Sequence, residues 1–379
     1  MMKYKVCFVL TSRADFSLAL PIINEFKKDK NLKVSVISSG YLSGKKYGKK
    51  IDLVKKHIKK VDFEIKNFPK SDTANNITDA FAEGVFKFSK YFRNYKPDYL
   101  FVFADKYEML SPVIASIQFK IPICHIEGGD LTEGALDDNI RHAITKFSHL
   151  HFVSTQEYKR RLIQLGEESW RISVTGSPSL DLIQNLNFIP KDKLSKKINF
   201  DVNKEFILCT FHPVTNELNK TKNYISSLIS SLKIQKFNII LTSPNADLTS
   251  LIIKKELKKF EKDYKNVKYL ERGEYLDYLS LMKYCKFMIG NSSSGIIESA
   301  SLKTKVINIG NRQKGRVIPK NVINCGYKQN EILLAINKIK KFKPIYFNPY
   351  YKKNVSKRIH NFFNSKLNKD IVNKRFVDI

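Results

Sequence analysis

Short apolar runs alternate with longer amphipathic segments along almost the whole chain. The apolar runs are nearly continuous in hydrophobic residues, which is typical of strands covered on both faces in a parallel sheet. The amphipathic segments between them predict helices, for example over 16–28, 73–94 and 137–147. This alternation predicts a doubly wound α/β architecture. The first six expected strands are 6–10, 33–38, 99–103, 121–126, 151–154 and 172–175.

The pattern is interrupted over 186–205, where a proline and a lysine-rich polar stretch predict an interdomain linker. Five further strands are expected after it, at 206–210, 238–241, 267–270, 287–289 and 305–309. A chain of 379 residues is long enough for two cores. We therefore expect two Rossmann-like domains facing a cleft, 1–186 and 205–345, followed by a C-terminal helical segment over 346–379.

Composition excludes some classes of protein. A hydrophobic content of 42% argues against disorder. The net charge of +31 would suit a nucleic-acid partner, but the lysines are spread over the whole chain rather than clustered, so we expect no nucleic-acid role. No apolar stretch approaches the ~18 residues of a membrane span. We expect a soluble cytoplasmic protein without a membrane partner.

The five cysteines are widely separated and include no CxxC pair. Most of them lie inside apolar runs, so they indicate buried thiols in a reducing compartment. Ligation of a metal by these residues is not expected. No metal or redox cofactor is predicted from any other spacing in the chain.

A glycine- and serine-rich turn, Gly-Asn-Ser-Ser-Ser-Gly-Ile-Ile-Glu, occupies 290–298 directly after an expected strand. The order predicts a helix that begins near Ser293, and the N–H groups at a helix N-terminus favour an anion. Ser292 and Ser293 add donors, and Gly295 lets the backbone come close to a phosphate. Glu298, one turn into that helix, could accept from both hydroxyls of a ribose. An ordinary serine N-cap would give the same pattern.

Three carboxylates of the first domain lie just past expected strand ends. Asp105 follows 99–103, Glu127 follows 121–126, and Asp137 begins the helix beyond that loop. Loops from neighbouring strands converge in a doubly wound sheet, so these groups could share one pocket. Clustered carboxylates have divergent pKa values, which suits general acid and base catalysis. Each residue alone could instead be a cap or a surface charge.

Other polar residues also follow strands. Arg13 comes after the first strand and could pair with a phosphate, unless Ser12 or Asp15 simply caps a helix there. His212 follows 206–210, where it could exchange a proton or satisfy local backbone. Arg312 lies in a cationic loop near the proposed diphosphate turn.

Taken in order, these segments resemble the hydrolysing branch of the UDP-N-acetylglucosamine 2-epimerase family, from sialic and legionaminic acid pathways. The resemblance covers nearly the whole chain. It rests on 12–15, the Asp105 loop, 125–129, 137–146, 211–215, 290–295 with Glu298, and 312–316.

The resemblance implies a fold of the glycosyltransferase-B type with a nucleotide sugar in the cleft, no cofactor, and a homo-oligomer, either a dimer or a tetramer. By position, it implies that Asp105, Glu127 and Asp137 form the acidic catalytic group, assisted by His212. It also implies that Glu298 holds the ribose. The residues implied to contact the substrate are Arg13, Pro244, Asn245, Ser292, Ser293, Gly295, Glu298 and Arg312, of which Arg13, Ser292, Ser293 and Arg312 would hold phosphate.

The reaction implied is loss of the nucleoside diphosphate together with the C2 proton, giving a 2-acetamidoglucal. Water then adds with the opposite configuration at C2 and releases a free manno-configured sugar. The substrate would be UDP-N-acetylglucosamine or a UDP- or GDP-linked 2,4-diacetamido-2,4,6-trideoxyglucose. Which carboxylate is the base and which the acid stays open, as does the nucleotide base.

One loop departs from the family's pattern. The family has Gly-Asp-Arg where this chain has Ala104-Asp105-Lys106. Lysine keeps the charge but lacks the bidentate fork of arginine, and Ala104 fills space that glycine leaves open. A shifted substrate preference or a reduced activity would follow. Two rival functions share the architecture, a non-hydrolysing 2-epimerase and a retaining glycosyltransferase.

Overall fold

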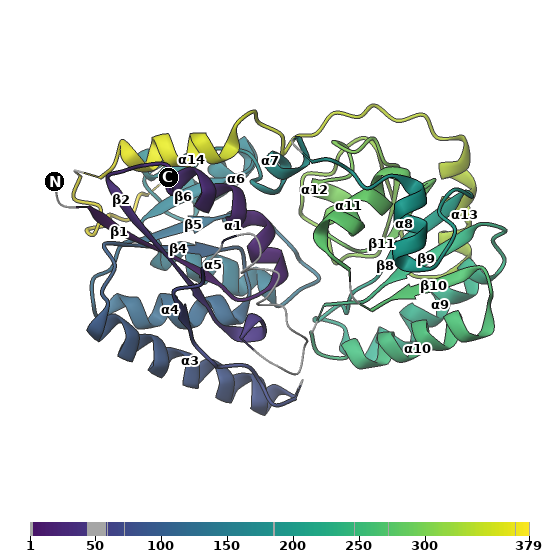
Figure 1. The fold of residues 1–379 in the computed structure, drawn as a ribbon, viewed down its shortest axis with the longest axis horizontal. Coiled ribbons are helices and arrows are strands. Elements are labelled where there is room, and N and C mark those ends of the chain that lie inside the picture. The colour runs from purple at the N-terminus through teal and green to yellow at the C-terminus, as the bar shows by residue number, and fades with distance from the viewer. Residues whose placement is uncertain are drawn as a thin grey trace. The chain divides into compact units, whose positions relative to one another are not determined.

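The computed structural model describes residues 3–43, 58, 60–71, 73–184, 186–245, 247–271, 273–367 and 369–378. The chain forms two compact units. The first consists of Met1–Asp130, Asp137–Leu182 and Tyr350–Ile379, and the second of Leu131–Leu136 and Ile183–Pro349. Both units are doubly wound α/β structures with parallel sheets (Figure 1), so the predicted fold class is confirmed.

The first unit contains a sheet of order β3-β2-β1-β4-β5-β6-β7, and every pairing in it is parallel. Helices α1 and α14 lie on one face of the sheet, and α3 and α4 lie on the other (Figure 1). Its strands are β1 (Tyr4–Leu10), β2 (Leu32–Ser38), β3 (Phe63–Glu64), β4 (Tyr99–Phe103), β5 (Ile123–Ile126), β6 (Leu150–Val153) and β7 (Ile172–Val174). Its helices are α1 (Arg13–Phe26), α3 (Ala74–Asn94), α4 (Tyr107–Ile117), α5 (Asp137–Phe147), α6 (Gln156–Gln164) and α14 (Val355–Asn364), and α7 (Ser179–Gln184) leads out of the unit.

The second unit contains a parallel sheet of order β10-β9-β8-β11-β12-β13. Helices α9 and α10 lie on one face, and α8, α11 and α12 lie on the other (Figure 1). Its strands are β8 (Phe206–Thr210), β9 (Asn238–Thr242), β10 (Val267–Leu270), β11 (Phe287–Gly290), β12 (Val306–Ile309) and β13 (Val322–Cys325). Its helices are α8 (Lys191–Ile198), α9 (Thr221–Lys233), α10 (Ser250–Asp263), α11 (Tyr275–Tyr284), α12 (Ser294–Ile297) and α13 (Gln329–Lys341).

The C-terminal helix α14 completes the core of the first unit. Phe363 is fully buried and lies 5.3 Å from Phe26 of α1 and 5.4 Å from Phe101 of β4, measured between ring centroids. Asp181 accepts hydrogen bonds from the backbone N–H groups of Val355 and Ser356 at 2.9 and 2.6 Å. These N–H groups begin a helix and have no partner within it, so a carboxylate there stabilises the end of α14.

All five cysteines are free thiols. Cys7, Cys124 and Cys209 are fully enclosed in strands, and burial raises the pKa of Cys7 and Cys209 to about 12. Every helix in the described part of the chain is too short or too polar to span a bilayer.

Candidate functional site

Each sheet has a switch point, where the strand order reverses and where ligands of doubly wound folds bind. In the first unit the order reverses between β1 and β4, and in the second between β8 and β11. Asp105 follows β4, while His212 follows β8. The predicted residues therefore fall into two groups, one at the switch point of each unit.

In the first unit, a buried arginine connects the predicted acidic loops. Arg141 of α5 forms an ion pair with Asp105. Its other terminal nitrogen, Nη1, donates to Asp138 at 2.9 Å and to the carbonyl of Asp130 at 3.0 Å. Lys106 Nζ lies 3.1 Å from Asp137 Oδ1. Asp105 and Asp137 thus belong to one network, because consecutive residues of the β4 loop pair with the first turns of α5.

The loop that departs from the family's pattern has a strained backbone. Ala104 has a φ of +54°, in the left-handed region where a side chain carrying a Cβ is disfavoured. A glycine at this position would adopt that conformation without the penalty. In this chain, therefore, Ala104 adopts the turn at a conformational cost that a glycine would not have.

Glu127 is buried and is held by two serines that follow the next strands of the sheet. Ser154 Oγ donates to Oε2 at 2.6 Å, and Ser177 Oγ donates to Oε1 at 2.5 Å. The residue itself has a φ of +65°. Strained non-glycine residues cluster at functional sites. The fixed orientation of this carboxylate at the end of β5 suits a group that must meet a substrate atom at a defined place.

The loop after β1 is organised as a helix cap. Ser12 is the N-cap of α1 and forms a capping box with Asp15. Asp15 Oδ2 also accepts from the hydroxyl of Thr11 at 2.6 Å. The capping interpretation of Ser12 and Asp15 is therefore observed. Arg13 begins α1, and its side chain lies outside the described part of the structure.

In the second unit, the backbone of His212 is held by a buried asparagine. Asn291 Oδ1 accepts from His212 N–H at 2.7 Å, and Asn291 Nδ2 donates to the His212 carbonyl at 2.9 Å. The backbone N–H of Asn245 donates to His212 Nδ1 at 3.0 Å. Because Nδ1 accepts, the neutral imidazole carries its proton on Nε2. Asn245 and the preceding Pro244, both predicted substrate residues, are thus part of the loop that orients His212.

The turn after β11 leads into a very short helix. Helix α12 spans only Ser294–Ile297, and Glu298 is its C-cap. The hydroxyl of Ser299 donates to the Gly295 carbonyl at 2.7 Å, so it competes with the backbone N–H that would donate to this carbonyl in a longer helix. The expected helix start near Ser293 agrees with the structure, and Glu298 lies about one turn further on, buried at the end of α12.

Hydroxyl groups of this turn contact one another. Ser292 Oγ and Ser294 Oγ are 2.9 Å apart, and Ser294 Oγ lies 2.5 Å from Tyr278 Oη. Gly295 packs against β12, where an added Cβ would lie 3.0 Å from Val306 Cγ1. Ser293 is the N-cap residue of α12, and its side chain makes no capping hydrogen bond among the described residues.

Arg312 is buried beside the same turn. Its Nη1 donates to the Asn291 carbonyl at 3.3 Å. Within the described residues, its Nε is buried and donates to no protein acceptor. A buried guanidinium N–H without an acceptor is costly unless a ligand supplies one. Arg312 and His212 are thus linked through one residue, Asn291.

Several residues that complete these groups were not predicted: Arg141, Ser154, Ser177 and Asn291. For Arg141 a signal exists, since it lies three residues after Asp138 on the expected helix, a spacing that brings side chains together. Ser154 and Ser177 follow expected strands adjacent to Glu127. Asn291 lies within the proposed turn, but its packing against His212 depends on which strands are neighbours.

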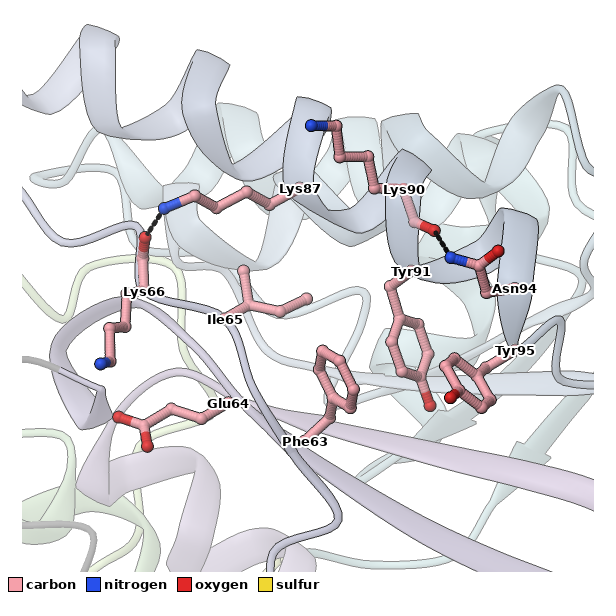
Figure 2. Close-up of a pocket in the computed structure, with 9 residues that line it drawn as sticks. All are labelled: Phe63, Glu64, Ile65, Lys66, Lys87, Lys90, Tyr91, Asn94 and Tyr95. Carbon is pink, nitrogen blue, oxygen red and sulfur yellow. Dashed lines mark hydrogen bonds between the residues drawn. The ribbon is translucent and has the colours of Figure 1, made fainter.

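A pocket of about 410 Å³ lies elsewhere on the first unit, between β3 and the C-terminal half of α3. Figure 2 shows Phe63, Tyr91 and Tyr95 on one side and the lysines of α3 beside them. None of its lining residues is a predicted site residue. Among the described residues, no cluster of His, Cys, Asp or Glu has the arrangement to hold a metal ion.

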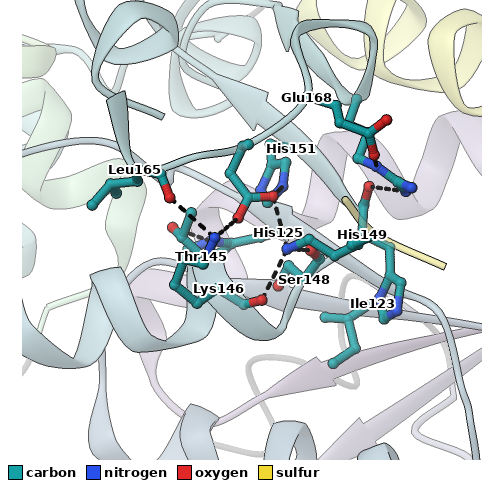
Figure 3. Close-up of polar contacts among 12 residues, drawn as sticks. Ile123, His125, Thr145, Lys146, Ser148, His149, His151, Leu165 and Glu168 are labelled. Atoms are coloured by element: carbon teal, nitrogen blue, oxygen red, sulfur yellow. Dashed lines mark hydrogen bonds and ion pairs between the residues drawn. The ribbon is translucent and has the colours of Figure 1, made fainter. Parts of the chain in front are cut away.

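A second polar network lies near β5 and β6 of the first unit (Figure 3). Glu167 is buried and contacts His151, Lys146 and Lys374 at 3.0, 2.8 and 2.7 Å. Lys374 also donates to the Ser148 carbonyl at 2.6 Å. His151 is thus part of the interior of this unit.

Comparison with known proteins gives a consistent set of similarities. A family described as UDP-N-acetylglucosamine 2-epimerase matches residues 24–364. The chain is 39% identical, over 90% of both chains, to the GDP/UDP-N,N'-diacetylbacillosamine 2-epimerase (hydrolyzing) of Campylobacter jejuni. It is 31% identical, over 98% of both, to the UDP-N,N'-diacetylbacillosamine 2-epimerase (hydrolyzing) of Legionella pneumophila. The fold resembles the UDP-GlcNAc 2-epimerase of Neisseria meningitidis bound to UDP-GlcNAc, with a TM-score of 0.81 at 21% identity, covering 95% of this chain and 100% of that one.

Proposed function

Because the chain belongs to the hydrolysing branch of the UDP-N-acetylglucosamine 2-epimerase family, we propose that it converts a nucleotide-linked 2-acetamido sugar and water into the free manno-configured sugar and a nucleoside diphosphate. The two relatives named above both act on diacetylbacillosamine nucleotides by name. We therefore take UDP- or GDP-linked 2,4-diacetamido-2,4,6-trideoxyglucose as the first candidate substrate and UDP-N-acetylglucosamine as the second. The product would enter nonulosonic acid synthesis of the sialic or legionaminic type.

Elimination is the first step of the proposed reaction. A carboxylate among Asp105, Glu127 and Asp137 takes the proton from C2, and the C1–O bond breaks with its electron pair passing to the diphosphate. A C1–C2 double bond forms, giving the 2-acetamidoglucal. In the second step, the oxygen of water bonds to C1 while a proton is delivered to C2 from the opposite face. The sum is one water consumed, one nucleoside diphosphate released and one inverted centre.

The second unit would stabilise the departing group. The Nε2–H of His212, whose ring is oriented by the Asn245 N–H, and the buried guanidinium of Arg312, which is held by the Asn291 carbonyl, are fixed donors, so they need no rearrangement as charge develops on the diphosphate. The hydroxyls of Ser292 and Ser293 would donate hydrogen bonds to the phosphates, and Arg13 would pair with them. Gly295 would let the backbone of the turn come close to the phosphates. Glu298 would hold the ribose. Pro244 and Asn245 would contact the nucleotide.

Glu127 carries the catalytic part of this proposal. It is a buried carboxylate with a left-handed backbone, and both its oxygens accept from serine hydroxyls that follow neighbouring strands. A base that removes a proton from a weakly acidic carbon must be held in a defined orientation, and the two hydrogen bonds provide this. Asp105 and Asp137, paired with Arg141 and Lys106, would be its acid–base partners.

The test is proton NMR of the purified protein in D₂O, with each candidate nucleotide sugar in a separate tube. We expect free manno-configured sugar with deuterium at C2, together with released nucleotide. Epimerised sugar still attached to the nucleotide would indicate the non-hydrolysing reaction. No change in any tube, with the protein folded, would refute the proposal and direct attention to a glycosyltransferase, which needs a separate acceptor.

We also propose that the protein acts in the cytoplasm as a homo-oligomer, a dimer or a tetramer, as the family resemblance implies. Light scattering after size-exclusion chromatography gives the mass in solution. A mass of 43.9 kDa, that of one chain, would contradict the oligomer.

A further inference from the structure

Six residues leave the first unit and belong to the second. The segment Leu131–Leu136, here called the strap, is part of the second unit, whereas Asp130 before it and Asp137 after it belong to the first. Asp137 is a proposed catalytic residue. The strap is therefore the covalent neighbour of that carboxylate while being packed with the nucleotide-binding unit.

The strap is fixed by the loop that follows His212. Thr215 Oγ1 accepts from the backbone N–H of Leu136 at 2.9 Å. Asn216 Nδ2 donates to the Glu133 carbonyl at 2.8 Å. The hydrogen bond from Leu136 N–H to Thr215 holds the last strap residue, directly beside Asp137 in the chain.

The strap also contacts the loop that carries Arg312. A Cβ added at Gly134 would lie 2.8 Å from Arg312 Cα and 2.9 Å from the Asn311 carbonyl oxygen, so no larger residue fits there without movement. Glu133 N–H donates to the Lys314 carbonyl at 3.2 Å. The backbone of the strap thus lies against the backbone of the proposed phosphate-binding residue.

In the first unit, the residues on either side of the strap are held by the acidic network. The Asp130 carbonyl accepts from Arg141, the same guanidinium that pairs with Asp105. Lys106 pairs with Asp137. One short stretch of chain is therefore tied at its ends to the catalytic carboxylates and in its middle to the Arg312 loop.

We propose that Thr215 and Asn216 are positioning residues that, through the strap, make the placement of Asp137 depend on the state of the Arg312 loop. This inference rests on the proposed function of Asp137 and Arg312. Neither Thr215 nor Asn216 needs to touch a reacting atom. A nucleotide that orders the Arg312 loop would order the strap with it, and the carboxylate would be set in place only when the leaving group is bound.

The variant Thr215→Val keeps the shape of the side chain and removes the acceptor, whereas Thr215→Ser keeps the hydroxyl. We expect Thr215→Val to lower kcat at least tenfold, because small misplacements of a catalytic group cost that much or more. KM and the Kd for the nucleoside diphosphate should stay within twofold of wild type. Thr215→Ser should restore most of kcat. Equal losses in both variants, or an unchanged kcat in Thr215→Val, would overturn the proposal.

Hydrogen–deuterium exchange tests the coupling without turnover. UDP and GDP are added separately, and exchange is followed in peptides covering the strap and the 310–316 loop. We expect nucleotide to slow exchange in both peptides of the wild type and of Thr215→Ser. In Thr215→Val, which removes the acceptor of the Leu136 N–H, the strap peptide should be protected less than in the wild type while the 310–316 peptide is protected equally. Slowing confined to the 310–316 peptide of the wild type would refute the coupling.

The two proposals can fail separately. A wild-type protein that shows linked protection of both peptides but no turnover on any nucleotide sugar would retain the coupling and lose the proposed function. If the wild-type protein turns over substrate but exchange in its strap peptide does not change when nucleotide is added, the proposed function stands and the coupling is refuted. No effect of either nucleotide on either peptide would overturn the inference.

Discussion

The carbonyl oxygen of Ala104 accepts a 2.8 Å hydrogen bond from Nε2 of His125. Burial lowers the pKa of His125 to about 3, so the ring is neutral at physiological pH. Its Nδ1 lies 3.2 Å from Thr145 Oγ1, which donates to it when Nε2 carries the proton. A buried imidazole thus holds the left-handed turn that presents Asp105.

Replacing Ala104 by Gly is predicted to stabilise the protein. The φ of +54° disfavours a Cβ, and glycine removes that penalty, so we expect a gain of about 0.5–1 kcal/mol in the free energy of unfolding. Urea denaturation measures it. The control is Ala143→Gly inside α5, which should lose about 1 kcal/mol because glycine is a poor helix former. A loss of stability in Ala104→Gly would contradict the interpretation.

Glu127→Gln is predicted to lower kcat by about 10²–10⁴ while the protein stays folded, because the amide keeps a hydrogen-bonding side chain but cannot act as a base. Steady-state kinetics with the substrate identified by NMR gives the value. Glu64→Gln, at an exposed residue of β3, is the matched charge control and should behave as wild type. Near-normal turnover in both Glu127→Gln and Asp137→Asn would refute the acidic assignment.

Arg312→Lys is predicted to weaken binding of the nucleoside diphosphate by about tenfold, because lysine lacks the fork of donors that guanidinium presents to phosphate. Isothermal titration calorimetry with UDP and GDP measures the change. Lys320→Ala, at an exposed position of the second unit, serves as the control for loss of positive charge. If both variants bind as wild type does, Arg312 does not contact the phosphates.

Acid is predicted to remove a stabilising contribution of Glu167. Burial by itself raises the pKa of this carboxyl, but the hydrogen bond and charge of His151 and the charge of Lys374 lower it to about 2, against 4.5 as the ordinary value. A depressed folded-state pKa stabilises above the unfolded pKa, and that contribution is lost as the pH falls toward the folded pKa.

We therefore expect wild type to exceed Glu167→Gln in unfolding free energy at pH 7, with about 3 kcal/mol from the pKa difference. This advantage should shrink between pH 4.5 and pH 2. Urea denaturation at several pH values in both proteins measures it. A difference that is the same at pH 7 and pH 3 would show that the lost interaction is not electrostatic.

Periodicity predicted most of the fold. The strands expected at 99–103 and 206–210 agree with β4 and β8, because each is an almost continuous apolar run between polar loops, and the strand expected at 267–270 agrees with β10, whose residues alternate between buried and half-buried. The pattern missed two strands. Strand β3 has only two residues, both exposed, and β13 has the same Val-Ile-Asn order as the correctly predicted β12 but was not predicted.

The sequence predicted the charged residues of the candidate site, but it did not predict the residues that hold them in place. Asp105, Glu127 and Asp137 were expected to share one pocket. The structure pairs Asp105 with Arg141 and Asp137 with Lys106, whereas the hydrogen bonds described for Glu127 come from Ser154 and Ser177. The serines that bind Glu127 could not be predicted, since Ser154 and Ser177 reach it only through the pairing of β5, β6 and β7. The helical segment expected over 346–379 contains α14, but the sequence pattern does not indicate that Tyr350–Ile379 packs into the first unit.

That last arrangement has a consequence for the order of synthesis. The strands of the first unit are synthesised long before Val355, Ile359 and Phe363, three residues of α14 that are fully buried in the core of that unit. The part of the second unit that contains its sheet, Ile183–Pro349, emerges in between and can close that sheet first. The nascent chain therefore carries an uncovered apolar face on its N-terminal half until α14 has been synthesised, so we expect a chain truncated before α14 to be prone to aggregation.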